Sequence, residues 1–209
     1  MPGDLDDLAR LERARGGRTP KWIAGALTPA NVVMGLMAFV SLKHSQNVAA
    51  AVGWWALALA LVVGVPYLIL FRALRTGKAA DRQVVRRSQR PALFAAAAVA
   101  VAVALIVLYV AGAPRQLVWL IAAMLCGLAA MGIITIWWKA SMHMAVAAGA
   151  VAVLFIENHT AGLIAALLLP VLGWARWTDG RHSVAQLVGG ALIGASVAGM
   201  VYGLLIQVS

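Results

Sequence analysis

Long stretches of apolar residues with few charges constrain this 209-residue chain more than any other feature. An α-helix needs about 20 apolar residues to cross the ~30 Å hydrocarbon core of a bilayer. Seven stretches approach or reach that length: 22–42, 50–71, 92–112, 117–138, 141–156, 161–175 and 184–207. Apolar residues make up 63% of the chain and charged residues only 11%, whereas about 25% is usual in soluble domains. The sequence therefore predicts an all-α, polytopic bundle of about six to seven transmembrane helices.

The stretches divide the chain into a basic tail, residues 1–21, and a single transmembrane domain over 22–209. The first apolar run is too long for the core of a signal peptide, so we expect the tail to be retained. The fifth and sixth stretches cover only ~21–24 Å at ~1.5 Å per residue. Residues 141–175 are therefore interpreted either as two short tilted spans or as a re-entrant hairpin.

The distribution of positive charge predicts the orientation. When the chain is threaded with its amino terminus inside, 15 of the 17 Lys and Arg residues fall on one side of the membrane, and Lys43 and Arg115 fall on the other. Such asymmetry in short loops is typical of a cytoplasmic side. We therefore expect a multi-pass protein of the inner (plasma) membrane with its amino terminus inside. Its basic residues would lie against lipid, which argues against a nucleic-acid partner.

Gly190 and Gly194 form a face of small residues in the last stretch, which favours close contact with another helix. The contact lies either within one chain or between two copies in a homo-oligomer.

Three polar segments interrupt the apolar background, at 78–91, 138–143 and 176–186, and the threading places all three on the cytoplasmic side. Taken alone, the first segment is explained by topology or by attraction to anionic lipid, and the second by a helix cap and an interfacial histidine. Together they bring many cations and two histidines, His143 and His182, to one face. His44 and His159 fall on the opposite side and are interpreted as interfacial side chains.

This set of side chains favours phosphate chemistry. Phosphoryl transfer depends mainly on positioning and on stabilising charge, which Arg and Lys donors can supply. A two-metal site would need clustered carboxylates, and only Asp81 and Asp179 are near. We therefore expect no metal and no cofactor. Two histidines can divide the work, one attacking phosphorus and the other protonating the departing alkoxide.

The order and spacing of these residues resemble the type 2 phosphatidic acid phosphatase superfamily, which comprises integral-membrane, metal-independent lipid phosphatases related to vanadium haloperoxidases. The signature of that superfamily is Lys-x6-Arg-Pro, then Pro-Ser-Gly-His, then Ser-Arg-x5-His-x3-Asp. In this chain the corresponding residues are Gln83-x6-Arg90-Pro91, Ala140-Ser141-Met142-His143 and Ala175-Arg176-x5-His182-x3-Gln186. The chain departs from the signature most at Gln83 and Gln186, and it has two stretches between the first two motifs where the family commonly has one loop.

The resemblance implies a role for each matching residue. His182 would be the nucleophile that forms a phosphohistidine, and His143 the acid that protonates the leaving lipid oxygen. Arg90, Arg176 and Ser141 would bind the phosphate. Gln186 would orient His182 by accepting its ring N–H. Further contacts to the phosphate would come from Gln83, Arg82, Lys78 and Lys139.

Two function classes follow. The first is dephosphorylation of a lipid phosphate or diphosphate, polyprenyl or glycerophospholipid, at the cytoplasmic face. The second is a non-catalytic membrane protein, either a transporter or a scaffold that binds anionic lipids. The substitutions at Gln83 and Gln186 favour the second class, because they are consistent with anion binding that has outlasted catalysis.

Overall fold

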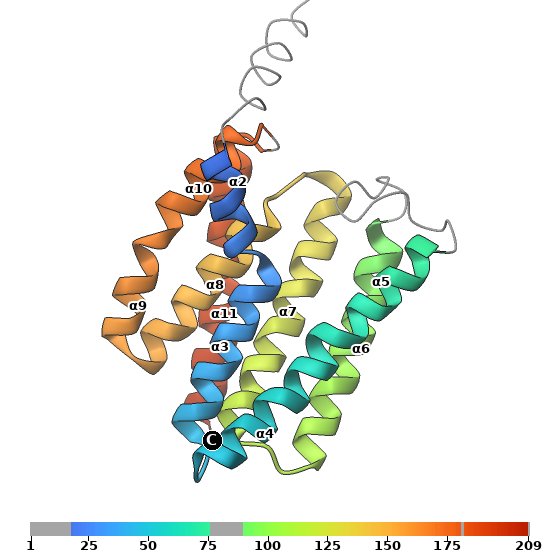
Figure 1. Ribbon diagram of the computed structural model, residues 1–209, viewed down its shortest axis with the longest axis vertical. Coiled ribbons are helices and arrows are strands. Elements are labelled where there is room, and N and C mark those ends of the chain that lie inside the picture. The colour runs from blue at the N-terminus through green and yellow to red at the C-terminus, as the bar shows by residue number, and fades with distance from the viewer. Residues whose placement is uncertain (1–17, 76–89, 181, 209) are drawn as a thin grey trace, which may run out of the picture.

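The computed structural model describes residues 18–75, 90–180 and 182–208, and every element in these ranges is a helix (Figure 1). The elements are α2 (Arg18–Ala26), α3 (Pro29–His44), α4 (Val48–Leu59), the π-helix η1 (Ala60–Gly64), α5 (Val65–Arg75), α6 (Arg90–Val110), α7 (Arg115–Trp137), α8 (Met142–Glu157), α9 (His159–Ala166), α10 (Leu168–Thr178) and α11 (Val184–Gln207). The prediction of an all-α bundle is confirmed.

The number of spans is smaller than expected. Among the described residues, four helices are long and apolar enough to cross a membrane: Val48–Ile69, Arg115–Trp137, His159–Thr178 and Val184–Gln207. A bent pair, Thr19–Ala26 with Pro29–His44, makes a fifth if it counts as one span. Two further apolar helices, Phe94–Val110 and α8, fall short of the length. By length and composition, the helices in the described part of the chain thus support four to five spans, fewer than the six to seven predicted.

The sixth stretch was predicted too short. The predicted stretch runs from 161 to 175, but α9 and α10 together form a 20-residue span from His159 to Thr178. The Asn158 side chain caps this helix by accepting the Ala161 N–H at 2.9 Å, so the span begins before residue 161. The fifth stretch is short as expected, since α8 has 16 residues and is therefore ~24 Å long.

The break between α2 and α3 follows from Pro29, which begins α3 and holds Thr28 in an extended conformation. The two helices bend by 43° at this point. The side chain of Asn31 donates to the carbonyl oxygen of Ala26 at 2.9 Å, and Thr28 Oγ1 accepts the Asn31 N–H at 3.3 Å. The backbone groups released by the break are therefore partly satisfied by side chains, as a membrane environment requires.

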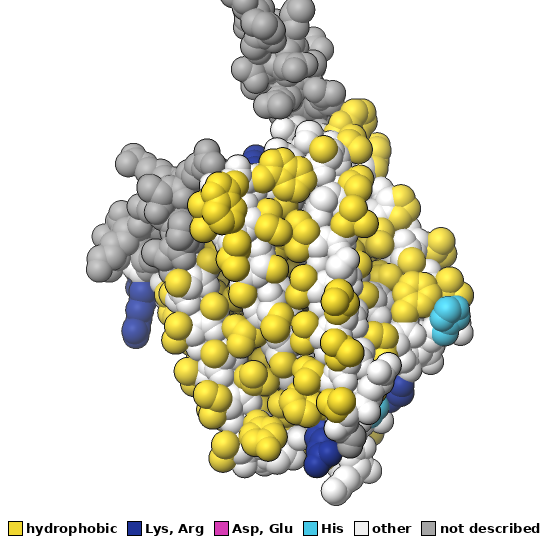
Figure 2. Space-filling model, turned by 180° about the vertical axis from the view of Figure 1, so that it is seen from behind, with side chains coloured by type: hydrophobic (Ala, Val, Ile, Leu, Met, Phe, Trp, Pro, Cys, Tyr) yellow, Lys and Arg dark blue, Asp and Glu magenta, His cyan; other side chains and the backbone are white. Residues whose placement is uncertain are grey.

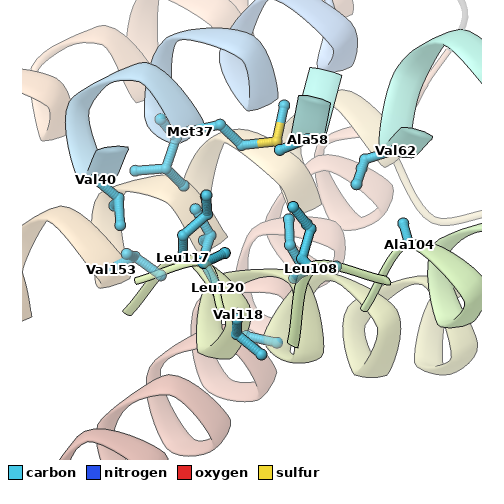
Figure 3. Packing of buried hydrophobic residues seen from close by; sticks show 14 of the residues in the cluster. Met37, Val40, Ala58, Val62, Ala104, Leu108, Leu117, Val118, Leu120 and Val153 are labelled. Atoms are coloured by element: carbon cyan, nitrogen blue, oxygen red, sulfur yellow. The ribbon is translucent and has the colours of Figure 1, made fainter. Parts of the chain in front are cut away.

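The main core lies among α3, α4, α6, α7, α8 and α11. Met37 and Val40 of α3, Leu117 and Leu120 of α7 and Val153 of α8 belong to one buried cluster (Figure 3). All five side chains are almost completely buried. This cluster holds together helices that are distant in the sequence.

The tightest helix contact joins α8 and α11. A Cβ atom on Gly194 would lie 1.9 Å from the carbonyl oxygen of Ala145, and one on Gly190 would lie 2.5 Å from that of Ser141. Only glycine fits at such distances. The small-residue face predicted from the sequence therefore packs within the chain.

The outer surface is strongly apolar. Large hydrophobic side chains are exposed along the bundle, including Val103, Ile133, Leu163 and Leu192, each more than half exposed. Figure 2 shows hydrophobic side chains covering one face, with Lys and Arg near its margins. This surface is compatible with a multi-pass membrane protein.

At the end of the bundle where α3 and α8 finish, one buried carboxylate joins three helices. Glu157, whose side chain is 3% exposed, receives Lys43 Nζ at 2.8 Å and His44 Nε2 at 2.7 Å on Oε2. The hydroxyl of Tyr202 in α11 donates to Oε1, and Lys43 also donates to the Glu157 carbonyl oxygen. His44 is therefore part of an ionic cluster, which differs from the interfacial role predicted for it. His159 is exposed and lies edge-on to Phe155 at 5.1 Å.

Candidate functional site

The second and third polar segments come together at the opposite end of the bundle. The link between α7 and α8, the end of α10 and the start of α11 meet there (Figure 1). The backbone N–H of Ser141 donates to the carbonyl oxygen of Gln186 at 3.0 Å. One turn further in, Met144, Leu172 and Leu187 form a buried cluster that joins α8, α10 and α11. Residues about 45 positions apart in the sequence thus share one site.

Ser141 lies at the N-terminus of α8. It is completely buried and occupies the N-cap position, yet its side chain makes no capping hydrogen bond. Its Oγ has no hydrogen-bond partner in the part of the chain that the structure describes. The first-turn N–H groups of a helix have no intrahelical acceptor and carry the positive end of the helix dipole. A buried hydroxyl without a partner therefore stands beside a group of donors suited to an anion.

Arg176 brings a guanidinium group to the same end from the last turn of α10. The residue is only 8% exposed, and its Nη1 lies 3.4 Å from Asp179 Oδ2. Gly180, with φ of 69°, lets the chain turn back toward α11. The Asp179 carboxylate thus gives the buried guanidinium an anionic partner, and Arg176 adds a positive charge to this end of the bundle.

His182 precedes α11 by two residues and is partly buried, and His143 is the second residue of α8 and is also partly buried. The two histidines predicted to act in catalysis are therefore carried by the two helix starts that meet at this end. Lys139, in the link between α7 and α8, is exposed there.

Gln186 is engaged differently from its expected role. Its side-chain Oε1 accepts the Ser183 N–H at 3.2 Å, while Ser183 Oγ accepts the Gln186 N–H at 3.3 Å. This reciprocal pair is a capping box, which satisfies two donors at the start of α11. The carbonyl oxygen expected to orient His182 is thus used to begin the helix. The Ser-x-x-Gln spacing was the signal in the sequence for this arrangement.

The first motif lies largely outside the described residues. Arg90 begins α6, but its side chain is not among those described, and Gln83, Arg82 and Lys78 fall in the range 76–89. The ends of the helices that flank this range, α5 and α6, lie at the same end of the bundle as Ser141 and Arg176 (Figure 1). Within the described ranges, His, Cys, Asp and Glu side chains form no group of three that could hold a metal ion.

Comparison with known proteins gives no match to a family model, a curated protein or a solved structure.

Proposed function

We propose that the protein is a metal-independent phosphatase that removes phosphate from a lipid phosphate or diphosphate, polyprenyl or glycerophospholipid, through a phosphohistidine. The observation that carries this proposal is the N-terminus of α8, where the buried Ser141 hydroxyl lacks a partner among the described residues beside first-turn N–H donors. The ordered likeness of three motifs to the type 2 phosphatidic acid phosphatases supports it further.

In the proposed reaction, a ring nitrogen of His182 attacks phosphorus, forming a P–N bond as the bond between phosphorus and the lipid oxygen breaks. His143 gives its proton to the departing alkoxide. Water then attacks the phosphohistidine, the P–N bond breaks, and His143 takes up a proton from the water. The products are inorganic phosphate and the lipid alcohol, or inorganic phosphate and the lipid monophosphate when the substrate is a diphosphate. Ser141 and Arg176 hold the phosphoryl oxygens, with Arg90 as a further cation from α6.

The proposed membrane arrangement has seven crossings, with the amino terminus and the site on the cytoplasmic side of the inner membrane. The support comes from the charges, since α2, α5, α6 and α10 place basic residues at the end that carries Ser141. In this arrangement the amino terminus and the start of α11 both lie at that end, and α11 runs away from it. The total number of crossings is therefore odd. On this arrangement α6, with 21 residues, and the shorter α8 both cross.

A non-catalytic scaffold that binds anionic lipids is the second candidate, and two observations favour it. Gln186 Oε1 is engaged in a helix cap, and Arg176 is paired with Asp179. A site that holds cations while the Gln186 side chain serves to cap α11 would bind phosphate without cleaving it.

Phosphate release by the detergent-purified protein in EDTA separates the two candidates. We expect wild type to release phosphate from at least one class among prenyl phosphates, prenyl diphosphates and glycerophospholipid phosphates. His182→Ala should release none, because the P–N bond cannot form. His159→Ala is the matched control, since His159 is exposed at the far end of the bundle and should retain full activity. Binding of anionic lipid without release by wild type would support the scaffold instead.

A further inference from the structure

An apolar cavity of about 330 Å³ lies among α3, α5, α7, α8 and α11. Its walls are almost entirely apolar and include Leu36, Leu120, Met124, Gly127, Met142 and Val153. Leu120 and Val153 of its lining are almost completely buried, whereas Tyr67 of α5 is 56% exposed, so the cavity reaches from the core of the bundle to its surface.

The cavity begins next to the candidate phosphate site. Met142, at its edge, directly follows Ser141 and is the first residue of α8. From there the lining follows α8 to Val153, a length of ~16 Å at ~1.5 Å per residue. A molecule with a phosphate at the N-terminus of α8 could therefore extend an apolar part into the cavity.

We propose that this cavity holds the hydrocarbon chain of a single-chain lipid phosphate, alkyl or prenyl, while its phosphate lies at the N-terminus of α8. The proposal rests on the proposed function, and it narrows the substrate to lipids with one short chain. The positive end of the α8 dipole and Arg176 match the negative charge of the phosphate. The apolar cavity beside them matches the hydrocarbon chain.

The volume argues for one chain of limited length. The cavity is at the lower end of the ~300–1,000 Å³ that ligand pockets usually occupy. If a methylene is taken as equal in size to a water molecule, at ~30 Å³ each, roughly eleven such groups fit. A glycerophospholipid brings two longer chains and a glycerol unit, and these exceed the space. Because lipid tails are as apolar as the cavity wall, selection here acts through size and shape rather than through hydrophobic attraction.

A second apolar groove, between α10 and α11, is the competing location. It is lined by Trp174 and Val188, which are 47% and 51% exposed, so membrane lipid would cover it in any case. The first cavity is lined in part by buried core residues such as Leu120 and Val153 and begins beside Ser141, which makes it the better candidate for a specific substrate.

Gly127 allows the cavity to be filled without disturbing the backbone. It lines the cavity on α7, and a Cβ built on it meets no atom within 4 Å. Gly127→Leu should therefore occupy the space of the chain and leave the fold intact. Gly53→Leu is the matched control, because Gly53 is exposed on α4, outside the cavity, and a Cβ there also meets nothing within 4 Å.

The test uses the full chain in detergent with dodecyl phosphate that carries a photoactivatable diazirine at its last carbon. We expect cross-links on cavity residues such as Leu120 and Val153, with labelling at least tenfold weaker in Gly127→Leu and unchanged in Gly53→Leu. Cross-links around Val188, or equal labelling in the two variants, would overturn the proposal.

Phosphate release is measured in parallel on dodecyl phosphate and on a two-chain phosphatidic acid. Cavity labelling without release from either lipid would leave the cavity assigned and would count against catalysis. Release that is independent of chain number, with no labelling of the cavity, would support catalysis and overturn the cavity proposal.

Discussion

Ser141 is a residue whose substitution should lower activity without lowering stability. A buried hydroxyl that has no partner among the described residues costs about 1–3 kcal/mol. We expect Ser141→Ala to leave the thermal unfolding midpoint unchanged or slightly higher, because it removes an unsatisfied group. Phosphate release should fall about 10²-fold, as on loss of one donor to a transition state.

Ser41 provides the control for this prediction. It is also completely buried, and its Oγ likewise has no partner among the described residues, but it lies in α3 near the far end of the bundle. Ser41→Ala should match Ser141→Ala in unfolding and wild type in activity. If both variants lose activity equally, the hydroxyl of Ser141 does not contact the phosphate.

Single residues also show which features could be predicted from the sequence and which could not. Ser141, His143, Arg176 and His182 were found by spacing, and the structure carries them to one end of the bundle. The cluster around Glu157 was missed, because its partners lie 45 and 113–114 positions away and no local pattern records such pairing.

At the scale of elements, the contact between α8 and α11 holds the site together. Gly194→Ala would place a methyl group 1.9 Å from the Ala145 carbonyl oxygen, and backbone cannot move aside as a flexible side chain would. We expect destabilisation of about 1–3 kcal/mol or more, measured as a lower unfolding midpoint. Phosphate release should fall as well, since the shift would separate Ser141 from Gln186.

Gly199→Ala tests the same helix without the clash. The nearest atom to its added methyl would be Ala152 Cβ at 3.5 Å, an ordinary contact. Alanine also favours helix by about 1 kcal/mol over glycine, so this variant should be neutral or slightly more stable. Similar losses in both variants would mean that α8 and α11 do not pack as closely as the structure has them.

The presence of the helices was predicted correctly from apolar composition. Helix ends that are set by capping residues were predicted wrongly. Each of the seven apolar stretches corresponds to one helix or to two or three consecutive helices, because hydropathy alone identifies them. The ends of the sixth were wrong because Asn158 caps α9 three residues before the predicted start, and Thr178 extends α10 past 175. Gln186 was assigned a role in orienting His182 from its position in the third motif, and the structure shows its side chain in the capping box of α11.

At the scale of the whole molecule, the number of helices that cross the membrane and their direction determine on which side the site lies. Positive charge gathers at the end with Ser141, and the bundle carries Lys43 and Arg115 at the other. If all seven apolar segments cross, the two ends lie on opposite sides of the membrane. If α8 instead turns back as part of a re-entrant hairpin, the links before and after it lie on the same side.

Cysteine labelling decides between these arrangements. The single native thiol is removed as Cys126→Ser, and cysteines are placed one at a time at the exposed residues Thr19, Gln46, Lys139 and Thr160. With a membrane-impermeant maleimide on intact cells, we expect labelling at 46 and 160, and labelling at 19 and 139 only after permeabilisation, because the cationic end should face the cytoplasm. Equal accessibility of 139 and 160 would make α8 re-entrant. The reverse pattern would place the phosphate site outside the cell, where its substrate would have to be a lipid phosphate of the outer leaflet.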